Sequence, residues 1–180
     1  MLRNLLILVL IFNCFFCFSQ NKKTLIKEGN SLYNDSSYNM AEMKYRKSLE
    51  KDQDYFNAAF NLADAIYKQN RFEESTSLFD ALKDNARNNE DLARINHNLG
   101  NSYLKENKLE QAIEEYKSSL RLNPNDEETR YNLAYAQKMK QQQDQQQDQQ
   151  QDEQEDQQQD QQEDQQQDQQ QDQKQEQEQD

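Results

Sequence analysis

The chain has 180 residues, 34 acidic and 21 basic side chains, and a formal net charge of −13. Its length allows about one domain of ordinary size, and its two Gly and one Pro argue against a turn-rich β sandwich or barrel. Residues 141–180 hold 14 acids and one Lys, so they alone carry the net charge. Because residues 1–140 have no basic excess, no nucleic-acid binding is expected. With so few turn-forming residues, the expected fold class is all-α.

The first twenty residues have the pattern of an export signal. Arg3 gives a positive start, and Leu5–Phe18 is almost wholly apolar. This run of 14 residues is shorter than the roughly 20 that a membrane-spanning helix needs, and it suits the apolar part of a secretory signal. Small residues at Cys17 and Ser19 permit cleavage before Gln20. We therefore expect an exported protein, periplasmic or associated with the envelope of a bacterium.

Two alternatives to a cleaved signal remain open. An uncleaved signal would anchor the chain in the membrane. If the signal is cleaved, the protein is expected to contact the membrane only through a partner. A lipoprotein signal needs a small residue just before the modified Cys, but Asn13 precedes Cys14 and Phe16 precedes Cys17, so it fits less well. Both Cys lie within this segment, and a processed chain would therefore have neither a thiol nor a disulfide.

The middle of the chain contains a repeated pattern. Small residues at Gly29, Ala63, Gly100 and Ala134 stand at equivalent places, with spacings of 34, 37 and 34 residues. The insertion of three residues is expected between the second and third repeats, within residues 83–91. The expected repeats are residues 22–55, 56–92 and 93–126, followed by a capping helix at residues 127–140, all within a domain of residues 21–140.

Each repeat is expected to form two helices joined by a short turn. Equivalent turn positions hold Ser36, Asn70 and Asn107, and Asn tolerates the left-handed backbone angles that end a helix. The second helix carries its packing residues at i, i+3 and i+7, on one face. These residues are Tyr38, Ala41 and Tyr45 in the first repeat, Phe72, Ser75 and Phe79 in the second, and Leu109, Ala112 and Tyr116 in the third.

Gly29 and Gly100, the only glycines, lie in the middle of predicted helices. Gly costs about 1 kcal/mol there relative to Ala, and this cost is tolerated where another helix must approach closely. Tyr45 and Tyr116 are expected to fill the gaps between neighbouring repeats. Because no single repeat can bury its apolar face alone, the stability must come from stacking.

These positions resemble the tetratricopeptide repeat family. The third repeat has the family's spacing most completely, and the second departs from it at Ala63 and Ser75; no repeat has the opening Trp. The resemblance covers about residues 22–140 and implies an α-solenoid of three helix-turn-helix repeats with a C-terminal capping helix. The third repeat carries it at Leu99, Gly100, Tyr103, Ala112, Tyr116 and Pro124.

Residues 141–180 form a low-complexity tail of Gln, Asp and Glu. An acid stands at every fourth position from Asp144 to Asp180, and no apolar residue follows Met139, so no core is possible. Like charges at i, i+4 oppose helix by roughly 0.2–0.5 kcal/mol per pair. We expect a disordered or loosely helical tail that acts as a solvated spacer, with a tether or a bait for basic partners or divalent cations as the alternative.

The chain lacks the residues that common catalytic and metal sites need. His97 is the only His, so paired-His metal sites and the usual Ser/His/Asp arrangement are excluded. Two isolated glycines cannot form a phosphate-binding loop. Paired carboxylates such as Glu73 and Glu74 are typical of a solvated helix face. We therefore expect a non-catalytic protein without cofactor or metal.

The resemblance implies a binding surface in place of a reactive centre. In tetratricopeptide repeat proteins the first helices of successive repeats line a concave surface that binds peptides or extended segments of partner proteins. Aromatic rings beside amide donors suit such binding; the alternative is that some of these rings are packing residues. Carried over by register, the surface contains Asn30, Tyr33, Phe60, Asn61, Asp64, Tyr67, Lys68, Arg94, His97, Asn101, Leu104 and Lys105.

One subtype of the family binds the acidic C-terminus of a chaperone with two Asn and three basic residues. Asn30, Asn61 and Arg94 match three of these positions. Ile26 and Asn98 stand where the other two basic residues are needed. A chaperone-type clamp is therefore disfavoured, in agreement with an exported protein.

The end of the repeats is the most particular feature. An exported protein of three repeats whose last helix reads YNLAYAQKMK, followed by a run of Gln, Asp and Glu, resembles components of bacterial aerotolerance (Bat-type) operons. That resemblance implies partners among membrane-anchored von Willebrand A-type proteins. The first hypothesis is an envelope scaffold that binds a partner segment in its concave groove. The second is a periplasmic folding or assembly factor for exported or outer-membrane proteins, which would release its clients.

Overall fold

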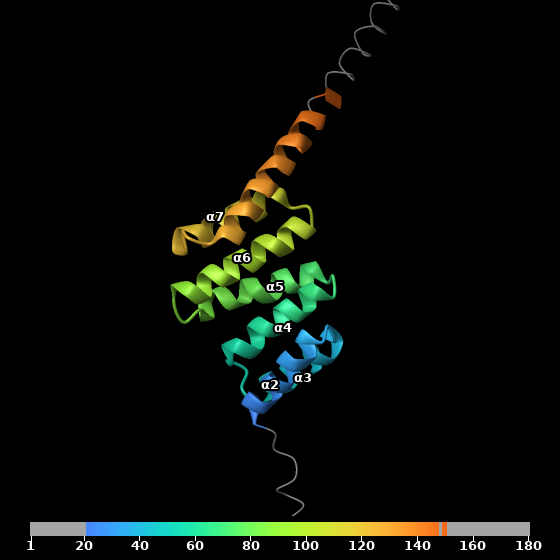
Figure 1. The fold of residues 1–180 in the computed structure, drawn as a ribbon, viewed down its shortest axis with the longest axis vertical. Helices are drawn as coiled ribbons and strands as arrows, with labels where there is room; N and C mark the ends of the chain where they lie inside the picture. The colour runs from blue at the N-terminus through green and yellow to red at the C-terminus, as the bar shows by residue number, and fades with distance from the viewer. Residues whose placement is uncertain (1–20, 148, 151–180) are drawn as a thin grey trace, which may run out of the picture. The chain divides into compact units, whose positions relative to one another are not determined.

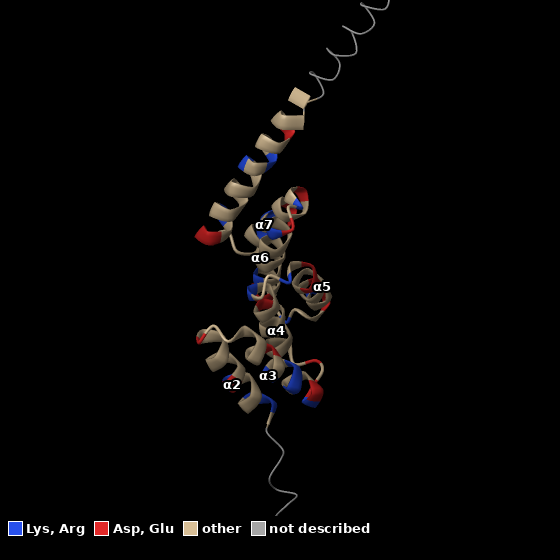
Figure 2. Cartoon of the chain, turned by 90° about the vertical axis from the view of Figure 1, so that its right-hand side faces the viewer, with Lys and Arg blue, Asp and Glu red and all other residues tan. Residues whose placement is uncertain are grey.

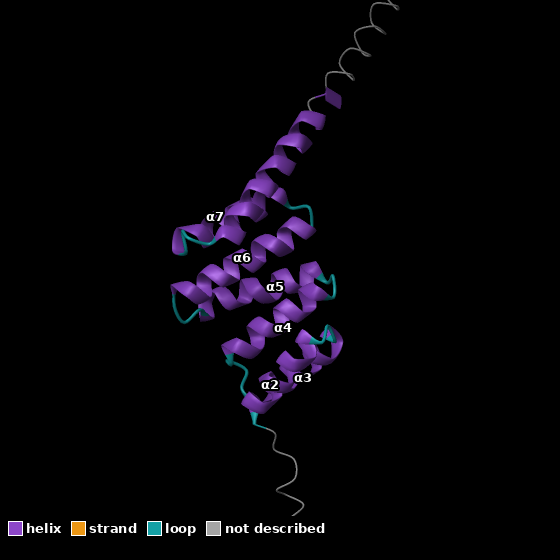
Figure 3. Cartoon of the chain, viewed as in Figure 1, coloured by secondary structure: helices purple, strands orange, loops and turns teal. Residues whose placement is uncertain are grey.

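The computed structural model describes residues 21–147 and 149–150, and the only regular structure in this part of the chain is helical (Figure 3). The chain divides after Ala134 into two compact parts. No helix among the described residues is long and apolar enough to span a membrane. The first part contains α2 (Lys22–Asn34), α3 (Tyr38–Lys51), α4 (Phe56–Lys68), α5 (Phe72–Leu82), the 3-10 helix η1 (Lys83–Asn85), α6 (Asn89–Lys105) and α7 (Leu109–Leu122).

The six α-helices form three hairpins that stack in chain order (Figure 1). Each helix packs on the next, and α2, α4 and α6 also contact one another in succession. The first helices therefore form one layer and α3, α5 and α7 the other. This arrangement confirms the predicted all-α solenoid of helix-turn-helix repeats. We refer to the hairpins α2–α3, α4–α5 and α6–α7 as repeats 1, 2 and 3.

The turn inside each repeat is left-handed at the position that the sequence pattern indicated. The backbone angle φ is 57° at Ser36, 62° at Asn70 and 59° at Asn107, and these are the only non-Gly residues with positive φ among those described. In repeat 3 the Lys108 amide then donates to the Tyr103 carbonyl at 2.9 Å, which closes the end of α6. Such a bond satisfies a carbonyl that the helix end would leave without a partner.

The longer connection between repeats 2 and 3 lies where the 37-residue spacing placed it. The chain passes from α5 through η1 and an extended Ala86 before α6 begins. The side chain of Asn88 caps α6, since its oxygen accepts from the Asp91 amide at 2.8 Å. Arg87 pairs with the Asp91 carboxylate at 2.7 Å, which holds the pKa of that carboxyl below its usual range.

Both glycines are required by a ring of the following helix. Tyr45 and Tyr116 are fully buried, and a methyl group at Gly29 or Gly100 would lie 2.5 Å from the nearest ring carbon. Repeat 2 has Ala63 at the same place, and there the ring is Phe79, which carries no hydroxyl. The close approach of the two helices therefore depends on a small residue facing an aromatic ring in every repeat.

Repeats 1 and 3 resemble each other more than either resembles repeat 2. In both, a buried Ser of the second helix donates to a carbonyl at the start of the first helix: Ser48 to Lys22 at 3.0 Å and Ser119 to Ala93 at 2.9 Å. The equivalent position in repeat 2 is Leu82, which joins the apolar core. At this position the middle repeat thus has an apolar contact in place of a polar link, whereas its buried Ser75 donates to the Ala63 carbonyl at 3.0 Å.

The helix after repeat 3 extends further than the sequence pattern predicted. Residues 127–147 are helical, so the helix does not end at residue 140 but enters the Gln and acid segment. Lys140 pairs with Asp144 there, one turn away, and such i, i+4 pairs favour helix. The expected signal at residues 1–20 and most of the tail, residues 151–180, lie outside the described part of the chain.

The turn geometry predicts opposite effects at equivalent positions. Ser36→Asn should raise the free energy of unfolding by about 0.5–1 kcal/mol, because Asn adopts positive φ more readily than Ser. Asn107→Ser should lower it by a similar amount. Urea unfolding followed by circular dichroism measures both. Effects of the same sign at the two positions would contradict the assignment.

The contact between glycine and ring predicts energetic coupling. Gly100→Ala should destabilise the fold by about 1–3 kcal/mol, because its methyl group overlaps the Tyr116 ring. Tyr116→Phe should cost about 1 kcal/mol for the lost hydrogen bond. The double variant reproduces the Ala63 and Phe79 pair of repeat 2, so its loss should be smaller than the sum by more than about 0.5 kcal/mol. Strict additivity in urea unfolding would refute this account.

Candidate functional site

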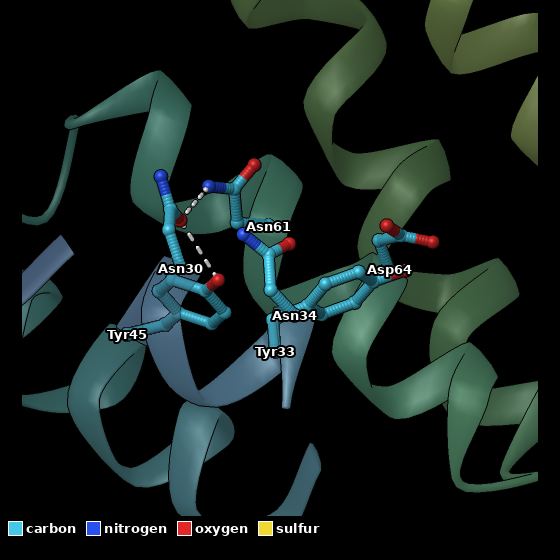
Figure 4. A pocket seen from close by; sticks show the side chains of 6 residues that line it. All are labelled: Asn30, Tyr33, Asn34, Tyr45, Asn61 and Asp64. Carbon is cyan, nitrogen blue, oxygen red and sulfur yellow. Dashed lines mark hydrogen bonds between the residues drawn. The ribbon is translucent and has the colours of Figure 1, made fainter. Parts of the chain in front are cut away.

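Two adjoining hollows lie on the layer of first helices. One, of about 200 Å³, opens between α2 and α4 (Figure 4). The other, of about 400 Å³, lies between α4, α6 and residues 126–128. Tyr33 and Asp64 line both hollows, so the two join at these side chains. We call this combined surface the groove.

Most of the residues that the register predicted for a binding surface line the groove. Ten of the twelve do so, whereas Leu104 and Lys105 line neither hollow. The lining also includes Asn34, Tyr45, Asn98, Asp126 and Glu128, of which register with the family had indicated Asn98 as a clamp position. The ten are Asn30, Tyr33, Phe60, Asn61, Asp64, Tyr67, Lys68, Arg94, His97 and Asn101.

Phe60 belongs mainly to the core. It is 6% exposed, and its ring packs edge-on against Phe79 with centroids 5.3 Å apart. The Arg94 guanidinium lies 4.3 Å from the centre of its ring and covers it. The aromatic patch expected from Tyr33, Phe60 and Tyr67 is therefore formed mostly by the two tyrosines, while Phe60 supports the cation of Arg94.

Tyr33 and Tyr67 are half-buried, each against a ring of the second helix in its own repeat. The centroid of Tyr33 lies 5.2 Å from that of Tyr38, and the centroid of Tyr67 lies 5.4 Å from that of Phe72. Burial, reinforced by the negative charge of Asp64, raises the pKa of both phenols above the ordinary value. Both hydroxyls therefore remain protonated and act as hydrogen-bond donors across the neutral pH range.

Asp64 is the carboxylate at the junction of the hollows. Burial raises its pKa above the usual value, and a hydrogen bond from the Tyr33 hydroxyl and the charges of Lys68 and Arg94 offset this in part. Asp64 makes no ion pair within the described part of the chain. It is thus a partly desolvated acceptor that the fold keeps in place at a cost in stability.

His97 has a single arrangement of protons that satisfies its neighbours. The Thr129 hydroxyl donates to Asp126 at 2.7 Å, so it can only accept from His97 Nδ1, 2.6 Å away. The Asn101 amide nitrogen lies 2.9 Å from Nε2 and must be its donor, because the Asn101 oxygen already accepts from the Tyr116 hydroxyl at 2.8 Å. The neutral Nδ1–H tautomer therefore links α6 to the start of the capping helix.

Asn30 has the same role at the other end of the groove. Its oxygen accepts from the Tyr45 hydroxyl and from the Asn61 amide, both at 2.9 Å (Figure 4). Burial and the charge of Asp64 raise the pKa of Tyr45 to about 12. These bonds connect α3, α2 and α4, so the amides at this end hold the helices of the groove together.

The side chains of the groove are of the kinds that recognise polypeptide segments. The described residues contain no group of three or more His, Cys, Asp or Glu side chains that could hold a metal ion. Basic and acidic residues are both scattered along the helices of the stack (Figure 2). Rings, amides and a few charges in a shaped hollow are the mixture that recognises peptides.

The raised pKa of Asp64 predicts how stability depends on pH. The folded protein holds the Asp64 proton to a higher pH than the unfolded chain, so stability falls as pH rises from the usual Asp pKa through the raised one. Asp64→Asn should therefore unfold at a higher temperature at pH 7, and this advantage should vanish near pH 3. Thermal unfolding across pH measures it. Glu128→Gln, at a side chain 76% exposed, is the control and should change little.

Two family models match the chain. The one described as Tetratricopeptide repeat matches residues 26–90, and the one described as TPR repeat matches residues 100–141. Together these segments make up more than half of the 180 residues. No curated protein matches the sequence.

Solved structures show the same fold at low identity. The first TPR of Spaghetti (RPAP3) bound to the HSP90 peptide SRMEEVD is 23% identical with a TM-score of 0.62, over 68% of this chain and 94% of that one. MamA from Desulfovibrio magneticus RS-1 is 22% identical with a TM-score of 0.62, over 67% and 66%. The TPR2AB domain of yeast Sti1 in its pHSP90 complex is 22% identical with a TM-score of 0.62, over 68% and 48%. Sequence models and architecture agree, and this chain is a tetratricopeptide repeat protein.

Proposed function

We propose that this protein binds an extended segment of a partner protein in the groove and acts as a non-catalytic scaffold. The observation that carries the proposal is the continuity of the two hollows, which join at Tyr33 and Asp64 and extend over three first helices. A small ligand is usually held in one cleft or cavity that buries most of its surface, whereas a polypeptide can lie along linked open hollows.

The side chains of the groove support this kind of ligand. Tyr33 and Tyr67 present rings with protonated hydroxyls, and amides line both hollows. Rigid aromatic side chains bury a large area with little loss of rotamer entropy, and amides pair with the backbone groups of an extended chain. The Spaghetti domain with the same fold is bound to an HSP90 peptide, and the Sti1 domain is in a complex with pHSP90, which supports a protein segment as the ligand.

The chaperone tail itself is not the proposed ligand. Ile26, at one of the positions where a clamp needs a basic residue, is 8% exposed and belongs to the core. At another, the Asn98 amide donates to the Arg94 carbonyl of its own helix at 2.9 Å. Arg94 alone remains of the three cations, so a segment of different chemistry is expected.

We further propose that the protein works in the bacterial cell envelope, within an aerotolerance-type complex. The export pattern of the first twenty residues supports the location, and the sequence YNLAYAQKMK before the Gln and acid tail supports the assignment. Membrane-anchored von Willebrand A-type proteins are the proposed partners. Affinity capture from a bacterium that encodes the protein should recover one such partner in stoichiometric amount, whereas several weakly held clients would indicate an assembly factor instead.

The groove assignment predicts which aromatic residues matter. Tyr33→Ala and Tyr67→Ala should each weaken binding of the captured partner at least about tenfold, as expected for central aromatic anchors. Tyr131→Ala is the control, because Tyr131 is 72% exposed and lines neither hollow. Titration calorimetry measures affinity, and circular dichroism verifies that each variant remains helical. Full affinity in both groove variants would refute the assignment.

A further inference from the structure

The three repeats place an acceptor side chain at one equivalent position of the first helix. These positions are Asn30, Asp64 and Asn101, separated by 34 and 37 residues like the repeats themselves. Asn30 and Asn101 accept from a ring hydroxyl of the second helix, that of Tyr45 or Tyr116, and the equivalent ring of repeat 2 is Phe79. A third equivalent position, on the first helix of the following hairpin, holds Asn61, Asn98 or Asn132. The same set of positions therefore occurs three times within one molecule.

In repeats 1 and 3 the acceptor is saturated by the protein. The Asn101 oxygen accepts from the Tyr116 hydroxyl at 2.8 Å and from the Asn132 amide at 3.0 Å. The Asn30 oxygen accepts from the equivalent Tyr45 and Asn61 groups, both at 2.9 Å. Two donors fill the two lone pairs of each carbonyl oxygen, so neither oxygen has capacity left for a ligand.

In repeat 2 both donors are missing. Phe79 has no hydroxyl, and the Asn98 amide donates to the Arg94 carbonyl instead. The acceptor is at the same time changed from an amide to the carboxylate of Asp64, which has about four acceptor positions. The Tyr33 hydroxyl is its one side-chain donor among the described residues. Asp64 therefore keeps unfilled acceptor capacity at the place where the two hollows join.

The linked changes show that repeat 2 is not a damaged copy of its neighbours. Ala63 replaces the Gly, and Phe79 replaces the Tyr, so the small residue and the ring still pack together. Only the acceptor has lost its partners. A charge without an ion pair costs stability when it is partly desolvated, and such a cost is typical of residues that a ligand satisfies.

We propose that Asp64 is the specificity-determining residue of the groove and selects a partner segment that inserts a Lys or Arg side chain between Tyr33 and Tyr67. This inference rests on the proposed binding function and names the chemistry of its ligand. A carboxylate forms its strongest hydrogen bonds with cationic donors, and a guanidinium can fill two of its acceptor positions at once. The flanking tyrosine rings stabilise the same cation through their faces.

The other charges of the groove are compatible with an incoming cation. The larger hollow carries Asp64, Asp126 and Glu128 against Lys68 and Arg94, so carboxylates exceed cations. Arg94 lies over Phe60, and Lys68 Nζ lies 5.8 Å from the centre of the Tyr67 ring. In the smaller hollow Asp64 is the only charged residue in the lining. A basic side chain that reaches Asp64 from this side meets acceptors and rings.

The test is a selection of random 12-residue peptides displayed on phage against the full chain, followed by fluorescence anisotropy with the enriched peptides. Enrichment of Lys or Arg is expected, and replacing that residue by Gln in the peptide should weaken binding at least tenfold. Asp64→Asn should cause the same loss in the protein. Glu114→Gln removes an equal charge from a side chain that is 64% exposed and lines neither hollow, so it should change affinity less than threefold.

A second variant separates charge from fold. Ala63→Gly, Asp64→Asn and Phe79→Tyr together give repeat 2 the set that repeats 1 and 3 already have, so this protein should remain helical and lose the basic peptides. Peptides that need Tyr33 but bind Asp64→Asn with full affinity, or that carry no enriched cation, would overturn the inference and leave the proposed function intact. If no selected peptide depends on Tyr33 or Tyr67 for binding, both the inference about Asp64 and the proposed binding function of the groove are wrong.

Discussion

The contact on which the stack depends is an aromatic ring pressed against a residue with little or no side chain. Tyr45 faces Gly29 and Tyr116 faces Gly100 so closely that a single methyl group has no room. This contact brings the two helices of a repeat together. Because stability comes from buried rings between repeats, the exposed layer of first helices can vary without loss of the fold.

That freedom explains why a groove can hold a residue that costs stability. Asn30 and Asn101 serve the fold, since each joins a ring hydroxyl to the next hairpin. Asp64 occupies the same position without those bonds, and the apolar packing of Phe79 keeps repeat 2 closed in their absence. In the middle repeat, therefore, Phe79 stabilises the packing of the helices, and Asp64 is left for the proposed binding.

The repeat pattern was sufficient to predict what depends on local chain geometry. The hairpins, the left-handed turns at Ser36, Asn70 and Asn107 and the place of the longer connection follow from spacing and residue type. What it missed depends on contacts between distant segments. Phe60 was expected on the surface, but the Phe79 ring and the Arg94 guanidinium enclose it. Aligning the repeats by position would have shown that Asp64 replaces the Asn found at this position in repeats 1 and 3. The repeat pattern itself gave no indication that Asp126 or Glu128 would line the groove.

The side chains at the two ends of the groove hold the helices around Asp64 in place. At one end Asn30 holds α2, α3 and α4 together, and at the other the contacts of His97 with Asn101 and Thr129 fix α6 to the start of the next helix. A frame whose donors and acceptors are already paired loses little entropy when a ligand arrives. In the proposed mode of binding, the ligand meets one carboxylate, Asp64, whose acceptor positions the protein fills only in part.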